Sequence, residues 1–491
     1  MRSNRYYAAI DLGSNSFHML VVRVVAGSVQ IVSKIKRKIR LAEGLQANNT
    51  LNEAAQQRAL ACLAIFADRV SDIAPENIRA VGTAALRKLA PSDPFLARIQ
   101  TTLGHPIQII SGEVEAQTIY QGVAHTTMTQ AELMVCDIGG ASTELALGRG
   151  FQTEQVVSID MGCVTWMTAF FANGRIQKTS AHAAIKAAEA LLQPRVAKFP
   201  ISEHARVLGA SGTFKALQEI ARARGRSERF TLAWLESLLH EVTQFERLEQ
   251  INMVGLKPDR TLVFLPGLCI LIALFRTLKL PHIETTEAAL REGLIYSMLT
   301  KLQQEDVQLR TLKSLAEHYH ADLSQTERVH RLFLKLSTVL QPFNETQLNL
   351  ARAVAYLHEI GLSLSYKQAG KHSRYLLKNT NLPGFSVAER EALLQVLEGV
   401  GGIIDDDKAP EELPADPALA ALTRVLRIAI TCCQRRRDDA IPDCSLTQLS
   451  PQQFVLQLPA NFSAKNPYLA SLLQEEQVFQ QPFGGLILQE T

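Results

Sequence analysis

The feature that most constrains the fold is a short motif that occurs twice. Residues 133–144 form an apolar run that ends on Asp137, breaks at two glycines and then resumes. Residues 6–22 repeat this order, with an apolar run that ends on Asp11, the turn Leu-Gly-Ser-Asn-Ser and a second apolar run. Each copy is typical of a strand, a tight turn and a second strand. Because the two aspartates lie 126 residues apart, the pair predicts an internally duplicated fold.

The chemistry of these turns favours phosphate. Glycines let the backbone turn sharply and bring its N–H groups close to an anion, and an adjacent aspartate such as Asp137 can hold a cation. A single turn of this kind is usually only a hairpin. Two such turns that face each other would surround a phosphate chain and supply aspartates for Mg²⁺ from both sides. We therefore predict a phosphate-binding cleft between two similar halves.

The composition excludes several classes of protein. The 491 residues are enough for about three or four domains, and 47% hydrophobic with 20% charged residues is typical of an ordinary folded protein. The net charge of +3 is too small to indicate nucleic acid as the main partner. The seven cysteines are odd in number, scattered and never in a CxxC pair, which indicates free thiols in a reducing compartment.

No membrane segment is predicted. The N-terminus runs directly into the first apolar strand, without the pattern of a signal peptide. The longest apolar run, residues 261–275, contains Pro266 and Gly267, lies between two arginines and is too short to span a bilayer comfortably. We predict that it is a buried core helix, and we expect a cytoplasmic protein.

Two basic features leave alternatives open. The run 34–40 alternates basic with apolar residues at the end of a predicted hairpin of strands, 17–25 and 29–39. It can be a solvated sheet face or a surface that attracts a polyanion. Arg87 follows a predicted strand at 78–83 and can be a surface residue or a bidentate phosphate ligand.

A helix predicted to begin at Ser111 carries Glu113 and Glu115 in its first turn. Carboxylates at this place stabilise the helix dipole without any chemistry. The helix also lies just before the second turn, where a carboxylate could act as general base towards a water that attacks phosphorus. Further on, residues 206–213 predict a strand and a glycine loop that opens a helix at 214–223, another anion site.

The C-terminal part, from about residue 311 to 430, predicts mainly helices. It contains His358-Glu359 and His372, which are candidate metal ligands, but no further histidine or aspartate has convincing helical spacing. A scaffold domain without metal is therefore favoured. The charge run 434–439 is interpreted as a solvated corner, and the last fifty residues as a small cap that contains strands.

Taken together, these motifs resemble the exopolyphosphatase and guanosine pentaphosphate phosphatase family over essentially the whole chain. The segments that carry the resemblance are Ala9–Met19, Ile110–Ala116, Asp137–Glu144, Met161–Cys163, Gly209–Thr213 and Ala289–Gly293. The resemblance implies an α/β fold with duplicated actin-like (ribonuclease H-like) ATPase-superfold domains, followed by an all-α HD-like domain and a small α+β C-terminal domain. The expected domains are 1–124, 125–304, 305–440 and 441–491.

Residues 163–166, 357–363 and 435–439 are similar to the guanosine pentaphosphate phosphatase branch. This similarity implies hydrolysis of the terminal 5′-phosphate of pppGpp to ppGpp and phosphate in the stringent response, with exopolyphosphatase activity as a side reaction. It also implies a homodimer. The alternatives are an exopolyphosphatase that acts mainly on inorganic chains, a non-catalytic alarmone-binding sensor and an ATP-dependent kinase of the same superfold.

The resemblance also assigns roles to residues. Glu115 matches the catalytic glutamate, while Asp137, Glu144 and Asp11 match the part of the site that holds Mg²⁺ and positions water. The implied phosphate- and nucleotide-binding residues are Gly13, Ser14, Asn15, Ser16, Arg87, Gly139, Gly140, Ala141, Ser142, Gly209, Ser211, Gly212, Thr213 and Arg260. Ala288 departs from the family pattern, because a glycine is usual at that position.

Overall fold

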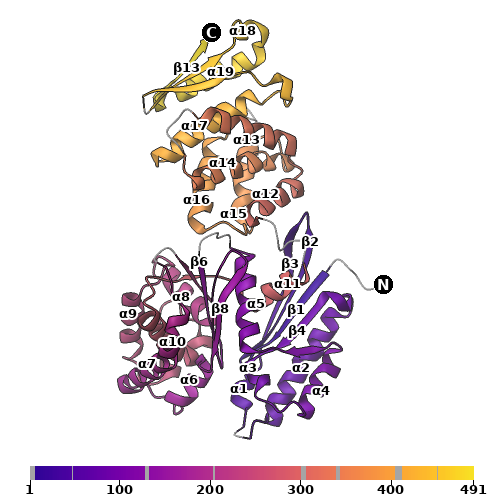
Figure 1. The fold of residues 1–491 in the computed structure, drawn as a ribbon, viewed down its shortest axis with the longest axis vertical. Helices are drawn as coiled ribbons and strands as arrows, with labels where there is room; N and C mark the ends of the chain where they lie inside the picture. Colours follow the sequence, from indigo (N-terminus) through magenta and orange to yellow (C-terminus); the bar gives the residue numbers. More distant parts are fainter. Residues whose placement is uncertain are drawn as a thin grey trace. The chain divides into compact units, whose positions relative to one another are not determined.

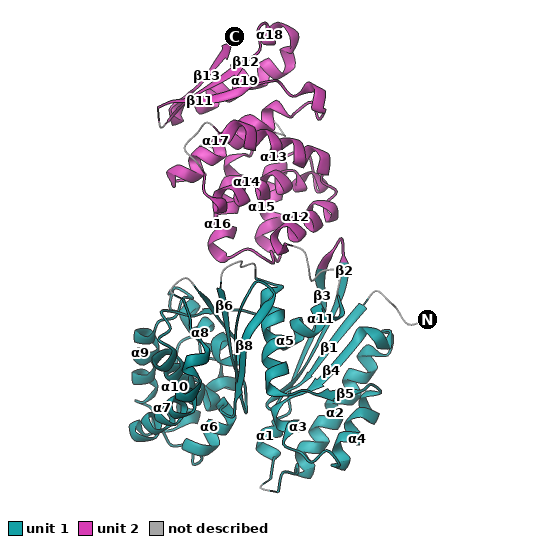
Figure 2. Ribbon diagram, in the orientation of Figure 1, with its two compact units in different colours: residues 1–24, 29–305 teal, residues 25–28, 306–491 magenta. Residues whose placement is uncertain are grey.

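The computed structural model describes residues 6–46, 48–127, 132–202, 205–299, 306–338, 343–403, 412–450 and 452–491. The chain divides into two units, one formed by residues 1–24 and 29–305 and the other by residues 25–28 and 306–491 (Figure 2). The predicted domain boundaries at 124/125 and 440/441 fall inside these units and stay predictions.

The first unit contains two five-stranded sheets with the same strand order. The first sheet has the order β3 (Ser28–Lys38), β2 (Ser16–Val25), β1 (Tyr6–Leu12), β4 (Ile78–Gly82) and β5 (Ile107–Ile109). The second has the order β8 (Gln152–Ile159), β7 (Thr143–Arg149), β6 (Glu132–Ile138), β9 (Arg206–Ala210) and β10 (Glu284–Thr285). In each sheet the central strand pairs antiparallel with the next strand in sequence and parallel with a later one. This repeated order is the duplication that the two motifs predict.

Amphipathic helices cover the first sheet. Helices α2 (Glu53–Val70) and α4 (Pro94–Leu103) begin at Asn52 and Asp93, whose side chains accept hydrogen bonds from backbone N–H groups in the first turn. Their buried side chains form one hydrophobic cluster with alternate residues of β1 and β2. The sheet therefore has one face that is packed against helices.

The core of the second half is built around α10 (Thr261–Leu278), the apolar run predicted to be a core helix. Every residue from Phe264 to Phe275 is buried. Among the described residues it is the one helix long and apolar enough to cross a membrane, and 72% of its most apolar stretch is buried inside the protein. Helices α6 (Cys163–Phe170), α7 (Lys178–Leu192) and α9 (Leu232–Val242) contribute to the same hydrophobic cluster.

Two sequence predictions in this half need correction. The predicted glycine loop at 211–213 is wrong, because α8 (Ser211–Ala223) begins at Ser211 and these residues form its first turn. The sequence also predicts a helical region from about residue 181 to 197, stopped by Pro200. In the structure α7 (Lys178–Leu192) ends earlier, and the chain continues as a 3-10 helix over Gln193–Lys198. The short helices α1 (Leu41–Gly44) and α3 (Ala84–Arg87) complete the unit.

Two helices join the halves of the first unit. Helix α5 (Gly112–Ala124) leads from the first sheet to the second and lies between them (Figure 1), and α11 (Leu290–Met298) packs against it. The contact is backbone against backbone, because a Cβ on Gly293 would lie 1.9 Å from the carbonyl oxygen of Thr118 and one on Gly122 would lie 2.4 Å from that of Ala289. A hydrophobic cluster that contains residues of both sheets and both helices surrounds this contact. The two halves therefore share one packed junction.

The second unit is mainly helical. It contains α12 (Val307–His318), α13 (Leu323–Ser337), α14 (Glu345–Leu357), α15 (Ala369–Asn379), α16 (Val387–Gly399) and α17 (Pro417–Cys432), then β11 (Ser445–Ser450), β12 (Gln453–Leu458), α18 (Phe462–Lys465), α19 (Pro467–Gln480) and β13 (Leu486–Glu490). The helices and the three-stranded sheet share one hydrophobic cluster. The fold is thus mixed α/β with a helical C-terminal region, while its predicted HD-like character stays a prediction.

A buried ion pair joins α17 to α19. The Nη2 atom of Arg427 lies 2.8 Å from a carboxylate oxygen of Glu476, and both side chains are almost fully buried. The guanidinium also donates to the carbonyls of Gly399 and Gly401 and lies over the ring of Phe479. Because the carboxylate of Glu476 and these hydrogen bonds compensate the guanidinium, its charge is tolerated inside the protein.

We predict that Gly293→Ala destabilises the protein. Helix propensity alone favours alanine over glycine by about 1 kcal/mol, whereas the clash with Thr118 should cost about 1–3 kcal/mol. Urea denaturation of the unmodified protein and of Gly293→Ala shows whether the substitution lowers or raises the free energy of unfolding. Ser297→Ala, on an exposed position of the same helix, is the control and should be neutral or slightly stabilising. A stabilised Gly293→Ala protein would contradict the close contact of α5 and α11.

Candidate functional site

A cleft of about 370 Å³ lies in the first unit, lined by both glycine turns, α5, α8 and the beginning of α11. The two turns are in contact, since a Cβ on Gly140 would be 3.3 Å from that of Ser14. All but two of the predicted site residues line this cleft. They are Asp11, Gly13, Ser14, Asn15, Ser16, Glu115, Asp137, Gly139, Gly140, Ala141, Ser142, Glu144, Ser211, Gly212, Thr213 and Arg260.

The two exceptions are Arg87 and Gly209. The Nη1 atom of Arg87 donates to the carboxylate of Glu115 at 2.7 Å and to the carbonyl of Ile110 at 3.0 Å. Its guanidinium therefore orients the glutamate rather than lining the cleft. Gly209 does not line the cleft but packs against Phe214, since a Cβ on this glycine would lie 2.1 Å from a ring carbon of Phe214.

Glu115 lies in the first turn of α5, whose N-cap is Ser111. Its side chain is buried although it lines the cleft. Burial raises the pKa of Glu115, and the hydrogen bond and charge of Arg87 oppose that rise. Glu113 in the same turn is exposed, so the two carboxylates of the predicted motif have different surroundings.

Strand pairing brings further carboxyls to the floor of the cleft. Glu144 lies opposite Asp137 in the register of β6 and β7, and Asp11 is the last residue but one of β1 in the other half. Burial, followed by the charge of Glu115, raises the pKa of both Asp11 and Asp137 to about 7. The pKa of Glu144 is also well above its ordinary value, again chiefly because of burial. Four carboxyls in one cleft cannot all be ionised without positive charge beside them.

This donor set fits a hard cation. Mg²⁺ prefers oxygen ligands and is usually held by one or two carboxylates, with water and substrate phosphate at its other positions. Within the described ranges, no group of three His, Cys, Asp or Glu side chains is arranged to hold a metal by itself. A cation that needs substrate phosphate to complete its shell is consistent with both observations. Asp137, together with either Glu144 opposite it or Asp11 from the other half, would then hold the cation.

Basic residues that the sequence analysis did not assign to the site also line the cleft. They are His18, Lys34, Lys36, Lys215 and Arg291. Burial and the neighbouring Arg260 lower the pKa of Lys36 to about 8. For Lys34 and Lys36, the alternating basic run at 34–40 was the sequence signal of a shared location, because alternate residues of a strand point to the same side.

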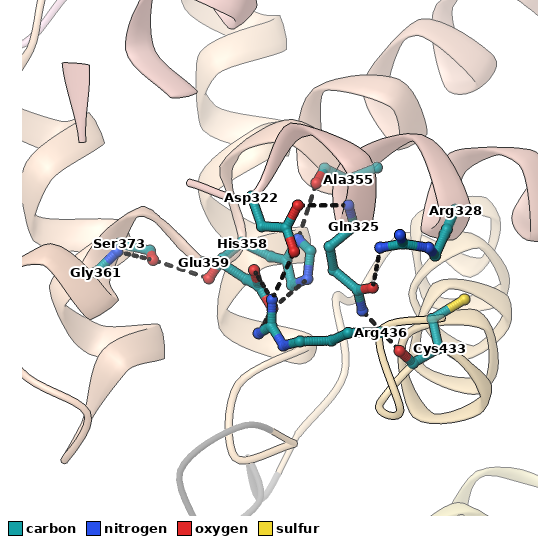
Figure 3. A network of polar contacts seen from close by, with 10 residues as sticks. All are labelled: Asp322, Gln325, Arg328, Ala355, His358, Glu359, Gly361, Ser373, Cys433 and Arg436. Atoms are coloured by element: carbon teal, nitrogen blue, oxygen red, sulfur yellow. Dashed lines mark hydrogen bonds and ion pairs between the residues drawn. The ribbon is translucent and has the colours of Figure 1, made fainter. Parts of the chain in front are cut away.

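The pair His358-Glu359 in the second unit, weighed as candidate metal ligands and set aside in favour of a scaffold without metal, has other partners. Glu359 is buried, and its two carboxylate oxygens accept hydrogen bonds of 2.6 and 3.2 Å from Arg436, which also pairs with Asp322 at 3.4 Å (Figure 3). His358 donates a hydrogen bond from Nδ1 to the carbonyl of Ala355, while His372 is not among the residues of this network. The run 434–439, interpreted as a solvated corner, therefore supplies a guanidinium to a buried carboxylate.

The raised pKa values predict how stability depends on pH. Asp11 and Asp137 keep their protons up to about pH 7 in the folded protein but lose them near 3.8 when unfolded. The folded state therefore binds more protons between these values, and stability should fall as pH rises from about 4 to 7. In EDTA, we expect Asp137→Asn to reduce the loss of unfolding free energy between pH 5 and pH 8 by at least about 1 kcal/mol, the equivalent of one pKa unit.

Asp68→Asn, on the exposed side of α2, is the matched control and should leave that loss unchanged. Chemical denaturation at both pH values provides the measurement. If Asp137→Asn lost as much stability as the unmodified protein, the carboxyl of Asp137 would have to be ionised in the folded state.

Solved structures share this fold. An exopolyphosphatase from Cytophaga hutchinsonii matches with a TM-score of 0.54 and 22% identity, over 60% of this chain and 98% of that one. An exopolyphosphatase-like protein gives 0.54 and 22%, over 60% and 97%. The Ppx/GppA enzyme of Aquifex aeolicus gives 0.51 and 22%, over 60% and 99%. At this identity the structures support the fold alone.

Sequence models provide the assignment to a family. The model of the Ppx/GppA phosphatase family matches residues 20–302, more than half of the chain and most of the unit that contains the cleft. The model of Ppx/GppA phosphatase domain III matches residues 307–477, in the helical unit. Together with the duplicated sheets and the carboxyl-rich cleft, these matches show that the chain belongs to the Ppx/GppA phosphatase family, a family of exopolyphosphatase-like hydrolases.

Proposed function

We propose that this phosphatase removes the terminal 5′-phosphate of pppGpp to give ppGpp and phosphate, with inorganic polyphosphate as a secondary substrate. The observation that carries the proposal is the distribution of charge in the cleft. Buried carboxyls meet at its floor, and basic side chains line it as well. A substrate with several phosphates in a row would match the basic residues while its terminal phosphate reached the carboxyls.

The protein's own groups would bind the substrate, position it and activate the water molecule. The turns that begin at Gly13 and Gly139 offer backbone N–H groups to the terminal phosphates, as expected for phosphoryl transfer by positioning and electrostatics. Mg²⁺, held near Asp137, would neutralise charge on these phosphates. Glu115 would take a proton from a water molecule, whose oxygen then attacks the terminal phosphorus. The bridging P–O bond breaks, and the electron pair leaves with ppGpp.

The surroundings of Glu115 suit a general base. A useful base has a pKa near the working pH. Burial alone would hold the proton too tightly, but the contact with Arg87 at 2.7 Å favours the ionised carboxylate. Arg87 would thus be a positioning residue that also keeps Glu115 able to accept a proton.

The first prediction is that Glu115→Gln lowers kcat for pppGpp by about 10²- to 10⁴-fold, because the amide cannot accept the proton. The substrate should still bind. Glu113→Gln makes the same change in the same helical turn, at an exposed position, and should keep normal turnover. Phosphate release under saturating substrate, with Mg²⁺, gives both rates. Near-normal turnover by Glu115→Gln would remove this residue from the role of base.

The second prediction concerns the substrate. Lys34 and Lys36 line the cleft from β3, and this observation favours the rival, an exopolyphosphatase, because they could follow an inorganic chain. We expect kcat/KM to be at least about tenfold higher for pppGpp than for polyphosphate, a difference of about 1.4 kcal/mol in transition-state binding. A preference for polyphosphate would support the rival. Tight binding of pppGpp without release of phosphate, with Mg²⁺ present, would instead favour a sensor.

A further inference from the structure

Arg291 is a cation in the cleft whose charge is not taken up by an acidic neighbour. It lines the cleft at the beginning of α11. Among the residues that the structure describes, its guanidinium has a histidine rather than a carboxylate as its hydrogen-bond partner. This contrasts with Arg87, whose charge is used by Glu115.

The backbone beneath Arg291 is fixed. Glu292 accepts a hydrogen bond from the backbone N–H of Ala289 at 2.9 Å and so closes the first turn of α11. The next residue, Gly293, lies directly against the carbonyl of Thr118 in α5. Because α5 also carries Glu115, the arginine and the proposed base are held by one rigid pair of helices.

The side chain of Arg291 has a neutral partner. Its Nη1 lies 3.2 Å from Nδ1 of His18. A guanidinium can only donate, so Nδ1 of His18 must be the acceptor. This geometry requires Nδ1 to be unprotonated, and burial, followed by the charges of Arg291, Lys36 and Arg260, acts in the same direction by lowering the pKa of His18.

The duplication allows His18 to be compared with the equivalent residue of the other half. In the second half, the residue paired with Asp137 across the hairpin is Glu144, whereas in the first half the residue paired with Asp11 is His18. A glutamate at position 18 would orient Arg291 but would also cancel its charge. A neutral imidazole orients the guanidinium and leaves the positive charge available.

We propose that Arg291 binds the terminal phosphate and that His18 is the positioning residue that holds Arg291 in place. The proposal rests on the proposed function, because it names two residues for the same phosphate site. A guanidinium can contact phosphate through two parallel N–H groups, which requires a defined orientation of its plane. The hydrogen bond to His18, on β2, supplies that orientation.

The test is a double-mutant cycle with inorganic tripolyphosphate and Mg²⁺ as the probe. Arg291→Met should lower kcat by about 10²- to 10³-fold, as for loss of one preorganised donor. His18→Phe should lower kcat by about 10- to 100-fold, because the guanidinium is misplaced rather than lost. In the Arg291→Met background, His18→Phe should change kcat by less than about twofold, since coupled residues are not additive. His18→Asn, which keeps an acceptor at the δ position, should recover most of the loss.

Equal effects of His18→Phe with and without Arg291 would overturn the proposal, as would the failure of His18→Asn to recover activity while thermal unfolding is unchanged. Binding measurements distinguish a failure of this proposal from a failure of the proposed function on which it rests. If no variant and not even the unmodified protein released phosphate, the proposed hydrolysis would be wrong. Calorimetric binding of tripolyphosphate should still weaken on His18→Phe only when Arg291 is present, and equal weakening in both backgrounds would refute the role of His18.

Discussion

The withdrawal of four neighbouring carboxyls from water is the constraint on which the site in the first unit depends. Asp11, Glu115, Asp137 and Glu144 line one small cleft, and burial alone already disfavours their charged forms. Such a cluster costs stability unless protons, cations or basic side chains compensate it. The surrounding fold provides what is needed, through Arg87 behind Glu115 and basic residues that line the cleft.

The paired strands and the paired helices have separate tasks in maintaining this arrangement. The hairpins place one aspartate and one partner residue at the floor in each half, so that repetition of a simple unit creates a two-sided site. The contact between Gly122 and Gly293 then sets the spacing of α5 and α11. Since Glu115 and Arg291 project from those helices, the distance between a base and a cation is determined by backbone packing rather than by flexible side chains.

The sequence was sufficient for features that depend on local chemistry. The two turns, the core helix at 261–278 and the position of Glu115 in a first helical turn all follow from glycine, apolar periodicity and capping by Ser111. Features that depend on contacts distant in sequence were not predictable. Arg87 meets a glutamate 28 positions away and Arg291 meets a histidine 273 positions away, and no local pattern announces either contact. The same holds for Arg436 and Glu359.

The pair formed by Arg427 and Glu476 has a consequence for how the second unit can be divided. Its partners lie on either side of position 440, where the family resemblance leads us to expect a domain boundary. Removing the last fifty residues would take away both the counter-charge of Arg427 and the ring of Phe479 that covers it. It would also uncover the apolar helical surface that packs against the tail. The tail is therefore an integral part of the helical bundle rather than an appendage. A chain without it would be expected to unfold or to associate with other copies through the exposed apolar surface.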